Sequence, residues 1–184
     1  MASKNVRVSI SGIKEISEST KSIINLAIAD EQHLKELAEV FKKSVVGSAR
    51  TGKDPDGKKF KPLSKSWIAR KKVLATVNQP SEFYSKNRSN ITFTGQLLNS
   101  FKYKINKAEV AITFFFEGMR VPYRGVLKPE LDGIKTNKEL AAKIEEVRPF
   151  AFLGEKTRDI LINLIRRKIR TQLNNFKRVS KILR

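Results

Sequence analysis

The fold class is decided by one stretch of the chain, Phe101–Phe116, which reads FKYKINKAEVAITFFF. Apolar residues occupy every second position from Phe101 to Ile105 and again from Val110 to Phe116. Such alternation is typical of a β-strand that buries one face. Asn106-Lys107 supplies turn residues between the two halves, so the stretch predicts a β-hairpin.

The second strand of this hairpin is apolar on both faces. Phe114 and Phe116 share one face, whereas Ala111 and Phe115 share the other. A strand of this kind needs cover on both sides. We expect the protein's own helices to cover one face and either a covering helix or a second subunit to cover the other. Phe114, Phe115 and Phe116 are therefore candidate subunit-interface residues.

A helix is predicted before the hairpin, with Asp30 as its N-cap and an end near Ser48. Its apolar stripe consists of Leu34, Leu37, Ala38, Phe41 and Val45. The single histidine, His33, lies beside this stripe, and we expect it on the helix surface.

A second long helix is predicted at the end of the chain, with Thr157 as its cap. Its apolar stripe consists of Ile162, Ile165, Ile169, Leu173 and Phe176. Shorter helices are predicted at 65–75, after a Thr94 cap, and at 137–146.

Together these patterns predict an α+β fold: a small antiparallel β-sheet, with its hairpin, packed against N-terminal and C-terminal helices. The 184 residues suit a single domain, 1–184. Within it, 1–30 is expected to form an N-terminal strand and helix, and 177–184 a basic C-terminal arm.

The composition narrows the classes of partner. The formal net charge is +20, from 38 Lys and Arg against 18 Asp and Glu. A charge this large favours nucleic acid, an anionic surface or an acidic protein. There are no cysteines, which excludes disulfides and thiolate metal sites. We find no apolar run long enough for a membrane span, and we expect no signal peptide and no membrane partner.

One turn-like stretch, Lys53–Ser64, reads KDPDGKKFKPLS and raises the question of a metal site. Asp54 and Asp56 could be the first two ligands of an EF-hand loop. The fifth and sixth positions are then Lys58 and Lys59, where a further oxygen ligand and a glycine are required. Calcium binding is therefore disfavoured.

A two-carboxylate nuclease centre is also disfavoured, because it needs further acids. Between Lys53 and Glu109 the only acids are Asp54, Asp56 and Glu82. A centre assembled from distant acids, such as Glu117 or Asp132, stays open. We assign no catalytic, cofactor-binding or metal-binding residue.

The favoured interpretation of Lys53–Ser64 is a structural turn. Pro55 fixes φ, Gly57 permits a positive φ, and the two aspartates accept hydrogen bonds from neighbouring backbone N–H groups. Phe60 and Leu63 are then expected to anchor this corner to a core.

Three segments resemble the phage virion morphogenesis family, the tail-completion or neck proteins of tailed phages. GKDPDGKKFKPLSKSWIARKK resembles its D-P-D-G-x-x-W/F-x-P-L-S segment, FTGQLLNSF its T-G-x-L-x-x-S, and RPFAFLG its R-P-F box. The resemblance covers residues 31 to 175. A His-Gln pair common after the family's hairpin is missing, and 128–147 looks like an insertion. The matching residues are Asp54, Pro55, Asp56, Gly57, Phe60, Pro62, Leu63, Thr94, Gly95, Leu97, Ser100, Arg148, Pro149 and Phe150.

The resemblance implies a structural virion protein without enzymatic activity, and no cofactor. It implies a homo-oligomeric ring around the DNA passage, which helps to join head and tail and contacts other neck, connector or tail proteins. The protein would be assembled in the host cytoplasm and reside in the virion, at the head–tail junction or tail end. The alternative is a non-catalytic nucleic-acid-binding protein that uses its basic C-terminal helix.

The basic residues of the final helix are the candidate contacts with DNA or an acidic partner. A solvated face is the other interpretation of such a charge run. These residues are Arg166, Arg167, Lys168, Arg170, Lys177, Arg178 and Lys181.

Overall fold

The computed structural model describes residues 7–8, 30–77, 96–120, 133–146 and 148–182. It confirms the α+β class and the antiparallel sheet packed by helices. In chain order the elements are β1 (Arg7–Val8), α2 (Glu31–Thr51), α3 (Lys65–Val77), α4 (Gln96–Asn99), β2 (Phe101–Asn106), β3 (Ala111–Phe116), α5 (Asn137–Glu145) and α6 (Glu155–Ile182). The N-terminal helix expected before Asp30 lies outside the described residues.

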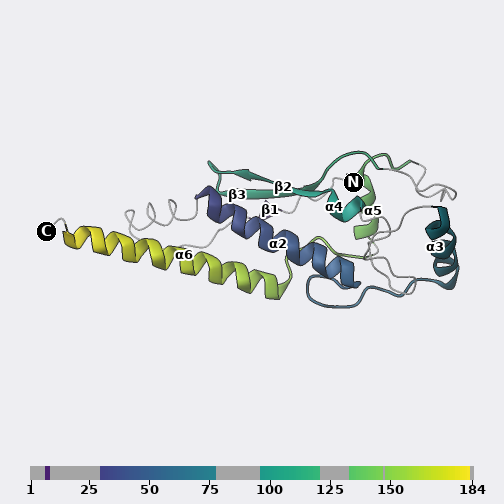
Figure 1. Ribbon diagram of the computed structural model, residues 1–184, viewed down its shortest axis with the longest axis horizontal. Helices are drawn as coiled ribbons and strands as arrows, with labels where there is room; N and C mark the ends of the chain where they lie inside the picture. The colour runs from purple at the N-terminus through teal and green to yellow at the C-terminus, as the bar shows by residue number, and fades with distance from the viewer. Residues whose placement is uncertain (1–6, 9–29, 78–95, 121–132, 147, 183–184) are drawn as a thin grey trace.

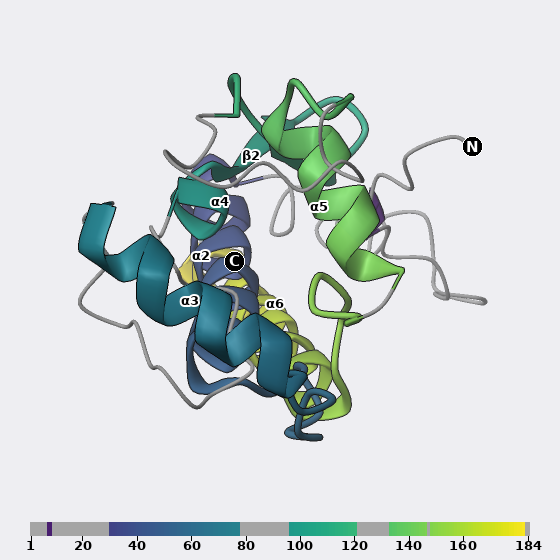
Figure 2. The same ribbon diagram turned by 90° about the vertical axis from the view of Figure 1, so that its right-hand side faces the viewer.

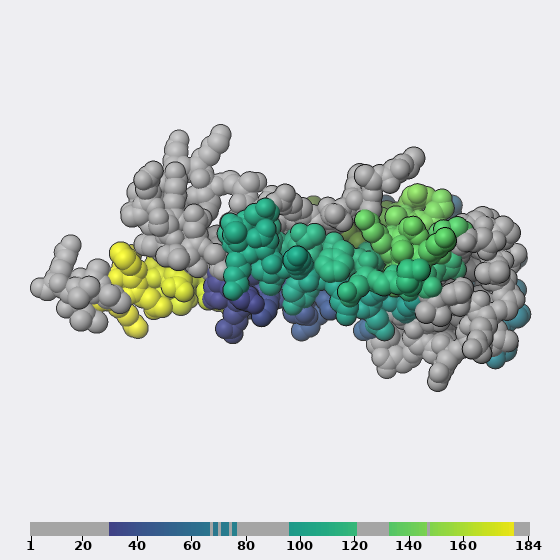
Figure 3. Space-filling view, turned by 90° about the horizontal axis from the view of Figure 1, so that it is seen from above, coloured from purple at the N-terminus to yellow at the C-terminus, as the bar shows by residue number. Residues whose placement is uncertain are grey.

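The main body has three layers: the sheet, then α2, then α6 (Figure 1). The helix α2 packs between the other two layers, and α6 runs antiparallel to it. The helix α3 lies across one end of the molecule, beyond the end of α2 (Figures 1 and 2). At the opposite end, the last part of α6 extends past both α2 and the sheet (Figure 3).

The predicted hairpin is confirmed. Strands β2 and β3 pair antiparallel with Phe101 opposite Phe116 and Ile105 opposite Ile112. The short strand β1 pairs with the other edge of β3, which therefore lies in the centre of the sheet. The prediction that β3 begins at Val110 is wrong, because Val110 has φ 47° and belongs to the turn.

The predicted α2 is confirmed, with Asp30 as its N-cap. The Asp30 carboxylate accepts the N–H of Gln32 at 3.0 Å. The helix continues three residues past the predicted end at Ser48, because Ala49 extends the buried stripe. It ends at Gly52, whose φ of 77° is the left-handed conformation that glycine adopts most readily.

Aromatic side chains form the centre of the core. The Phe41 ring of α2 lies 4.4 Å from that of Phe114, and the Phe101 ring lies 5.6 Å from that of Phe114. The Phe116 ring is 5.8 Å from that of Phe150, which is completely buried. Two strands, one helix and the segment before α6 thus share one core.

The predicted helix at 137–146 is confirmed as α5, and it is part of this core. A capping box joins Thr136 and Glu139 at its start. The buried Asn137 amide donates to the carbonyl of Glu117 at 2.8 Å, and Ala141 is buried. This part of the segment that looks like an insertion is therefore built into the domain.

Two predictions for α6 are wrong. Thr157 is not its cap: the helix begins at Glu155, and the buried Thr157 hydroxyl hydrogen-bonds with that of Ser44 on α2 at 2.5 Å. The predicted apolar stripe is wrong at its two ends, because Ile162 and Phe176 are exposed, whereas its middle residues Ile165, Ile169 and Leu173 are half-buried. The side that faces α2 instead follows Thr157 and Leu161, both buried, and continues through half-buried Leu164, Ile165 and Lys168.

The surface position predicted for His33 is wrong as well, because its side chain is 3% exposed. His33 lies one turn before Leu37 and therefore belongs to the edge of the buried stripe. Its Nδ1 is 3.5 Å from the Glu36 carboxylate, and its Nε2 has no hydrogen-bond partner among the described residues.

Candidate functional site

The stretch Lys53–Ser64 folds into a closed turn in which Asp54 bonds to its neighbours. The Asp54 carboxylate accepts the N–H groups of Asp56 at 3.0 Å and Lys58 at 2.8 Å. The Gly57 N–H donates to the Asp54 carbonyl at 2.9 Å, and Gly57 has φ 87°. These contacts agree with a structural turn, and they engage one Asp54 carboxylate oxygen in backbone bonds.

The second aspartate has a role that the sequence did not suggest. The Asp56 carboxylate accepts the N–H of Glu155, the first residue of α6, at 2.7 Å. A residue 99 positions earlier in the chain therefore satisfies an N–H that would otherwise lack a partner at the start of α6. We had expected Asp56 to bond to a neighbouring N–H.

This contact is close because of Gly154. The backbone of the turn lies so near that a Cβ at position 154 would be 2.7 Å from the Pro55 carbonyl carbon and oxygen. The same Cβ would be 2.7 Å from Oδ1 of Asp56. Pro55 and Gly154 are both buried. The end of RPFAFLG and the DPDG turn thus form one joint at the start of α6.

The remaining residues of the turn segment differ in burial. Phe60 is buried and its N–H donates to the Gly52 carbonyl at 2.9 Å, so it anchors the corner as predicted. Leu63 is half-buried and Pro62 is exposed.

The second resembling segment is described only in part, since Thr94 and Gly95 lie outside the described residues. Leu97 is buried in the core on α4. The Ser100 hydroxyl donates to the Leu97 carbonyl at 2.7 Å, and the Ser100 carbonyl accepts the N–H of Glu117 at 2.9 Å. This segment therefore closes the end of the hairpin.

The third segment is held by a carboxylate that sequence reasoning missed. Glu145, at the end of α5, accepts the N–H groups of Phe150 at 3.1 Å and Ala151 at 3.3 Å. Burial raises the pKa of this carboxyl, and the two backbone bonds oppose that rise. Pro149 is exposed, whereas Arg148 is half-buried. An acid three residues before the R-P-F box was the only signal in the sequence.

A second cation lies near Arg148. Lys71 of α3 is 4% exposed, and its pKa falls to about 8, mainly through burial and also through the charge of Arg148. Burial likewise lowers the pKa of Arg148. The third segment is thus close to α3 as well as to the core.

The three phenylalanines of β3 separate as their alternation predicts. Phe114 is 4% exposed in the core, and Phe116 contacts Phe101 and Phe150 on the same face. Phe115 is half-buried on the other face, where its strand partner is Lys102. The candidate interface is therefore reduced to Phe115, because the other two rings are used within the chain.

The basic residues of α6 form two groups: those that pair with acids at α2 and those that are exposed. Lys168 lies 2.6 Å from the carboxylate of Asp30, and Arg167 lies 3.3 Å from that of Glu36. The bond from Lys168 lowers the pKa of Asp30. These two cations hold α6 against α2. Arg166, Arg170, Lys177 and Arg178 are exposed, and the Lys181 side chain lies outside the described residues.

Among the described residues, no group of three or more His, Asp or Glu side chains is placed to hold a metal ion. In the same part of the chain, no helix is long and apolar enough to cross a membrane. One surface concavity lies along α6 and another along α2.

Comparison of the chain with protein-family models, with curated proteins and with solved structures found no match. The resemblance to the phage virion morphogenesis family therefore stays a prediction from the three quoted segments.

Proposed function

We propose that this chain is a structural virion protein of a tailed phage, a tail-completion or neck component. In this role, copies form a ring around the DNA passage and join head to tail. One observation carries the proposal: residues of all three resembling segments belong to one framework. Phe60, Leu97 and Phe150 lie in the same core, and Asp56 contacts the backbone at the start of α6.

The contacts between these segments are what a shared structural role requires. Two of these segments, about 100 residues apart in the chain, meet where Asp56 accepts the N–H of Glu155. The carboxylates of the first segment also form hydrogen bonds with the backbone. Carboxylate oxygens of Asp54 and Asp56 accept backbone N–H groups, which suits a scaffold better than a catalytic centre.

The outer face of β3 is the surface where we place a neighbouring copy. The half-buried Phe115 lies there, opposite the exposed Lys102. An aromatic ring with a charged rim is a common composition for a subunit contact.

The experiment is inactivation of this gene in the phage that encodes it, with the wild-type chain supplied in trans as control. We expect DNA-filled heads and separate tails by electron microscopy, and joined virions on complementation. Joined, infectious virions without the chain would contradict the proposal. Complementation by Phe115→Asp tests the contact surface, and Lys43→Gln, which removes an exposed charge from α2, is its control.

A further inference from the structure

The charges of α6 are segregated along its length. Its acids, Glu155 and Asp159, lie at its beginning, and no acid occurs from Ile160 to Ile182. Seven basic residues lie in that acid-free part, from Arg166 to Lys181. Elsewhere in the described chain some lysines pair with acids of their own helix, as Lys35 does with Glu31 and Lys143 with Glu146. A surface designed only for solubility intersperses both signs.

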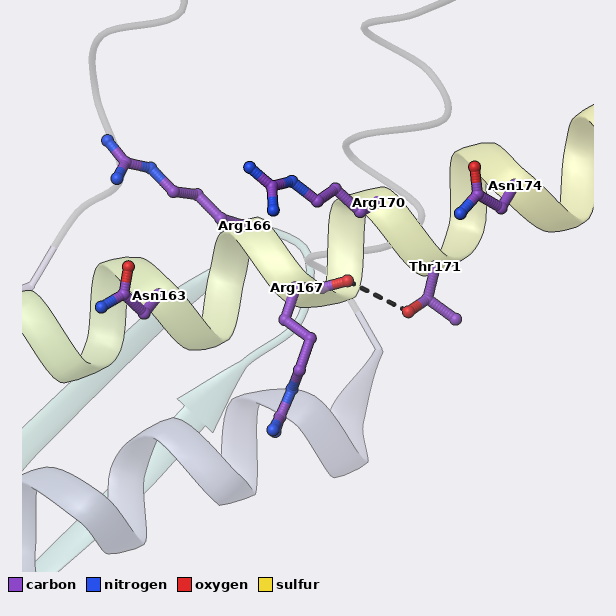
Figure 4. Close-up of a pocket in the computed structure, with 6 residues that line it drawn as sticks. All are labelled: Asn163, Arg166, Arg167, Arg170, Thr171 and Asn174. Atoms are coloured by element: carbon purple, nitrogen blue, oxygen red, sulfur yellow. Dashed lines mark hydrogen bonds between the residues drawn. The ribbon is translucent and has the colours of Figure 1, made fainter.

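Two arginines of α6 point away from α2. Figure 4 shows Arg166 and Arg170 on one side of α6, whereas Arg167 extends toward α2. Arg166 and Arg170 are exposed, and neither has an ion-pair partner in the part of the chain that the structure describes. Asn163 and Asn174 lie on the same side, one turn before and one turn after them. We call these four residues the outer strip of α6.

The outer strip matches a row of phosphates in spacing and chemistry. Four residues along a helix span about 6 Å, and two phosphate steps along one DNA strand span about 7 Å. The guanidinium group is a planar donor that pairs with phosphate in bidentate fashion, and asparagine amides also donate to phosphate oxygens. The row continues toward Lys177, nine residues after Lys168, which contacts Asp30 at the start of α2.

An acidic protein is a poorer match for the outer strip. The centres of protein–protein interfaces are depleted of charge and depend on apolar or aromatic anchors. All four residues of the strip are polar, and the exposed Ile162 and Phe176 of α6 are not among the residues that line this concavity.

We infer that the outer strip of α6 binds the phosphate backbone of duplex DNA without regard to base sequence. The test of DNA binding requires only the purified chain, whereas the test of the assembly role requires phage. Failure of one proposal is therefore distinguishable from failure of the other. Phosphates carry no sequence information, so the affinity should depend on salt rather than on sequence.

The test is fluorescence anisotropy with a labelled duplex of about two helical turns, between 50 and 200 mM NaCl. The wild-type chain is compared with Arg166→Gln/Arg170→Gln. The matched control, Lys58→Gln/Lys61→Gln, also removes two positive charges, but from exposed positions in the turn segment. Thermal melting checks that both variants fold.

We expect removal of two phosphate contacts to reduce the slope of log affinity against log salt by about 1.8. From 50 to 200 mM salt, the wild-type affinity then falls about 12-fold more than that of the arginine variant. The lysine control should keep the wild-type slope.

Four outcomes would overturn the inference. The first two are no binding at 50 mM salt and an equal reduction of the salt slope in the two double variants. The third is a tenfold difference in affinity between duplexes of different sequence. The fourth is displacement of the duplex by polyglutamate of equal total charge. The last outcome would assign the strip to an acidic protein partner.

Discussion

Adding one methyl group at Gly154 should separate the DPDG turn from the start of α6. The new Cβ would lie 2.7 Å from the carbonyl carbon and oxygen of Pro55. Ordinary contact distances begin at 3.4 Å, so the backbones must move apart by about 0.7 Å or more. Both residues are buried, and overpacking of this kind typically costs about 1–3 kcal/mol.

The same displacement should break the bond from the Glu155 N–H to Asp56. Loss of a helix cap costs about 1 kcal/mol, so Gly154→Ala should lower the free energy of unfolding by about 2–4 kcal/mol in total. Asp56→Ala alone should cost about 1 kcal/mol. In the double variant Asp56→Ala/Gly154→Ala, the helix cap is lost only once and one close contact is gone. Its total loss of unfolding free energy should therefore nearly equal that of Gly154→Ala alone.

Urea denaturation at pH 7 of the four chains measures this coupling, which we expect to be about 1 kcal/mol. Gly47→Ala is the matched control, because a Cβ at Gly47 in α2 meets no atom within 4 Å. That change should stabilise the protein by about 0.5–1 kcal/mol. Additive losses, or a Gly154→Ala cost below about 0.5 kcal/mol, would refute the reasoning.

Four further substitutions test other parts of the structure. Phe114→Ala should cost about 3–5 kcal/mol by urea denaturation, whereas Phe115→Asp should cost less than half as much and reduce self-association by mass photometry; equal costs would contradict the two-face assignment. Pro149→Ala, at an exposed position, should change the free energy of unfolding by less than about 0.5 kcal/mol. Lys71→Met should stabilise at pH 7 by up to about 3 kcal/mol, because burial lowers the Lys71 pKa from 10.5 to about 8. That gain should shrink as pH rises from 8 to 10.5, where the unfolded wild-type chain binds more protons than the folded one; equal gains at pH 7 and pH 10 would refute it.

The features that the sequence predicted well depend on neighbouring residues. Alternation and turn residues were sufficient for the hairpin, and the Asp30 cap with its apolar stripe was sufficient for α2. Val110 was misassigned because its side chain continues the alternation while its backbone turns. In each case the deciding interactions lie within a few positions along the chain.

The features that were missed depend on distant partners. The residues next to His33 in the sequence do not predict that α6 packs on its side of α2. The orientation of α6 depends on contacts such as Ser44 with Thr157, and its start depends on Asp56. Two of the seven basic candidates, Arg167 and Lys168, proved to pair with α2. Charge type was predictable, but the direction of each side chain was not.

The joint between Asp56 and Glu155 also constrains the order in which the chain can fold. Helix α6 follows every other described element, so it leaves the ribosome after them. Until then α2 has no partner on its outer side, and the turn has no helix to cap. Closing a loop of about 100 residues is entropically costly and slow compared with forming a local hairpin. Completion of the domain is therefore a late step in its biosynthesis, and chains interrupted before α6 would display the apolar outer side of α2 to chaperones and proteases.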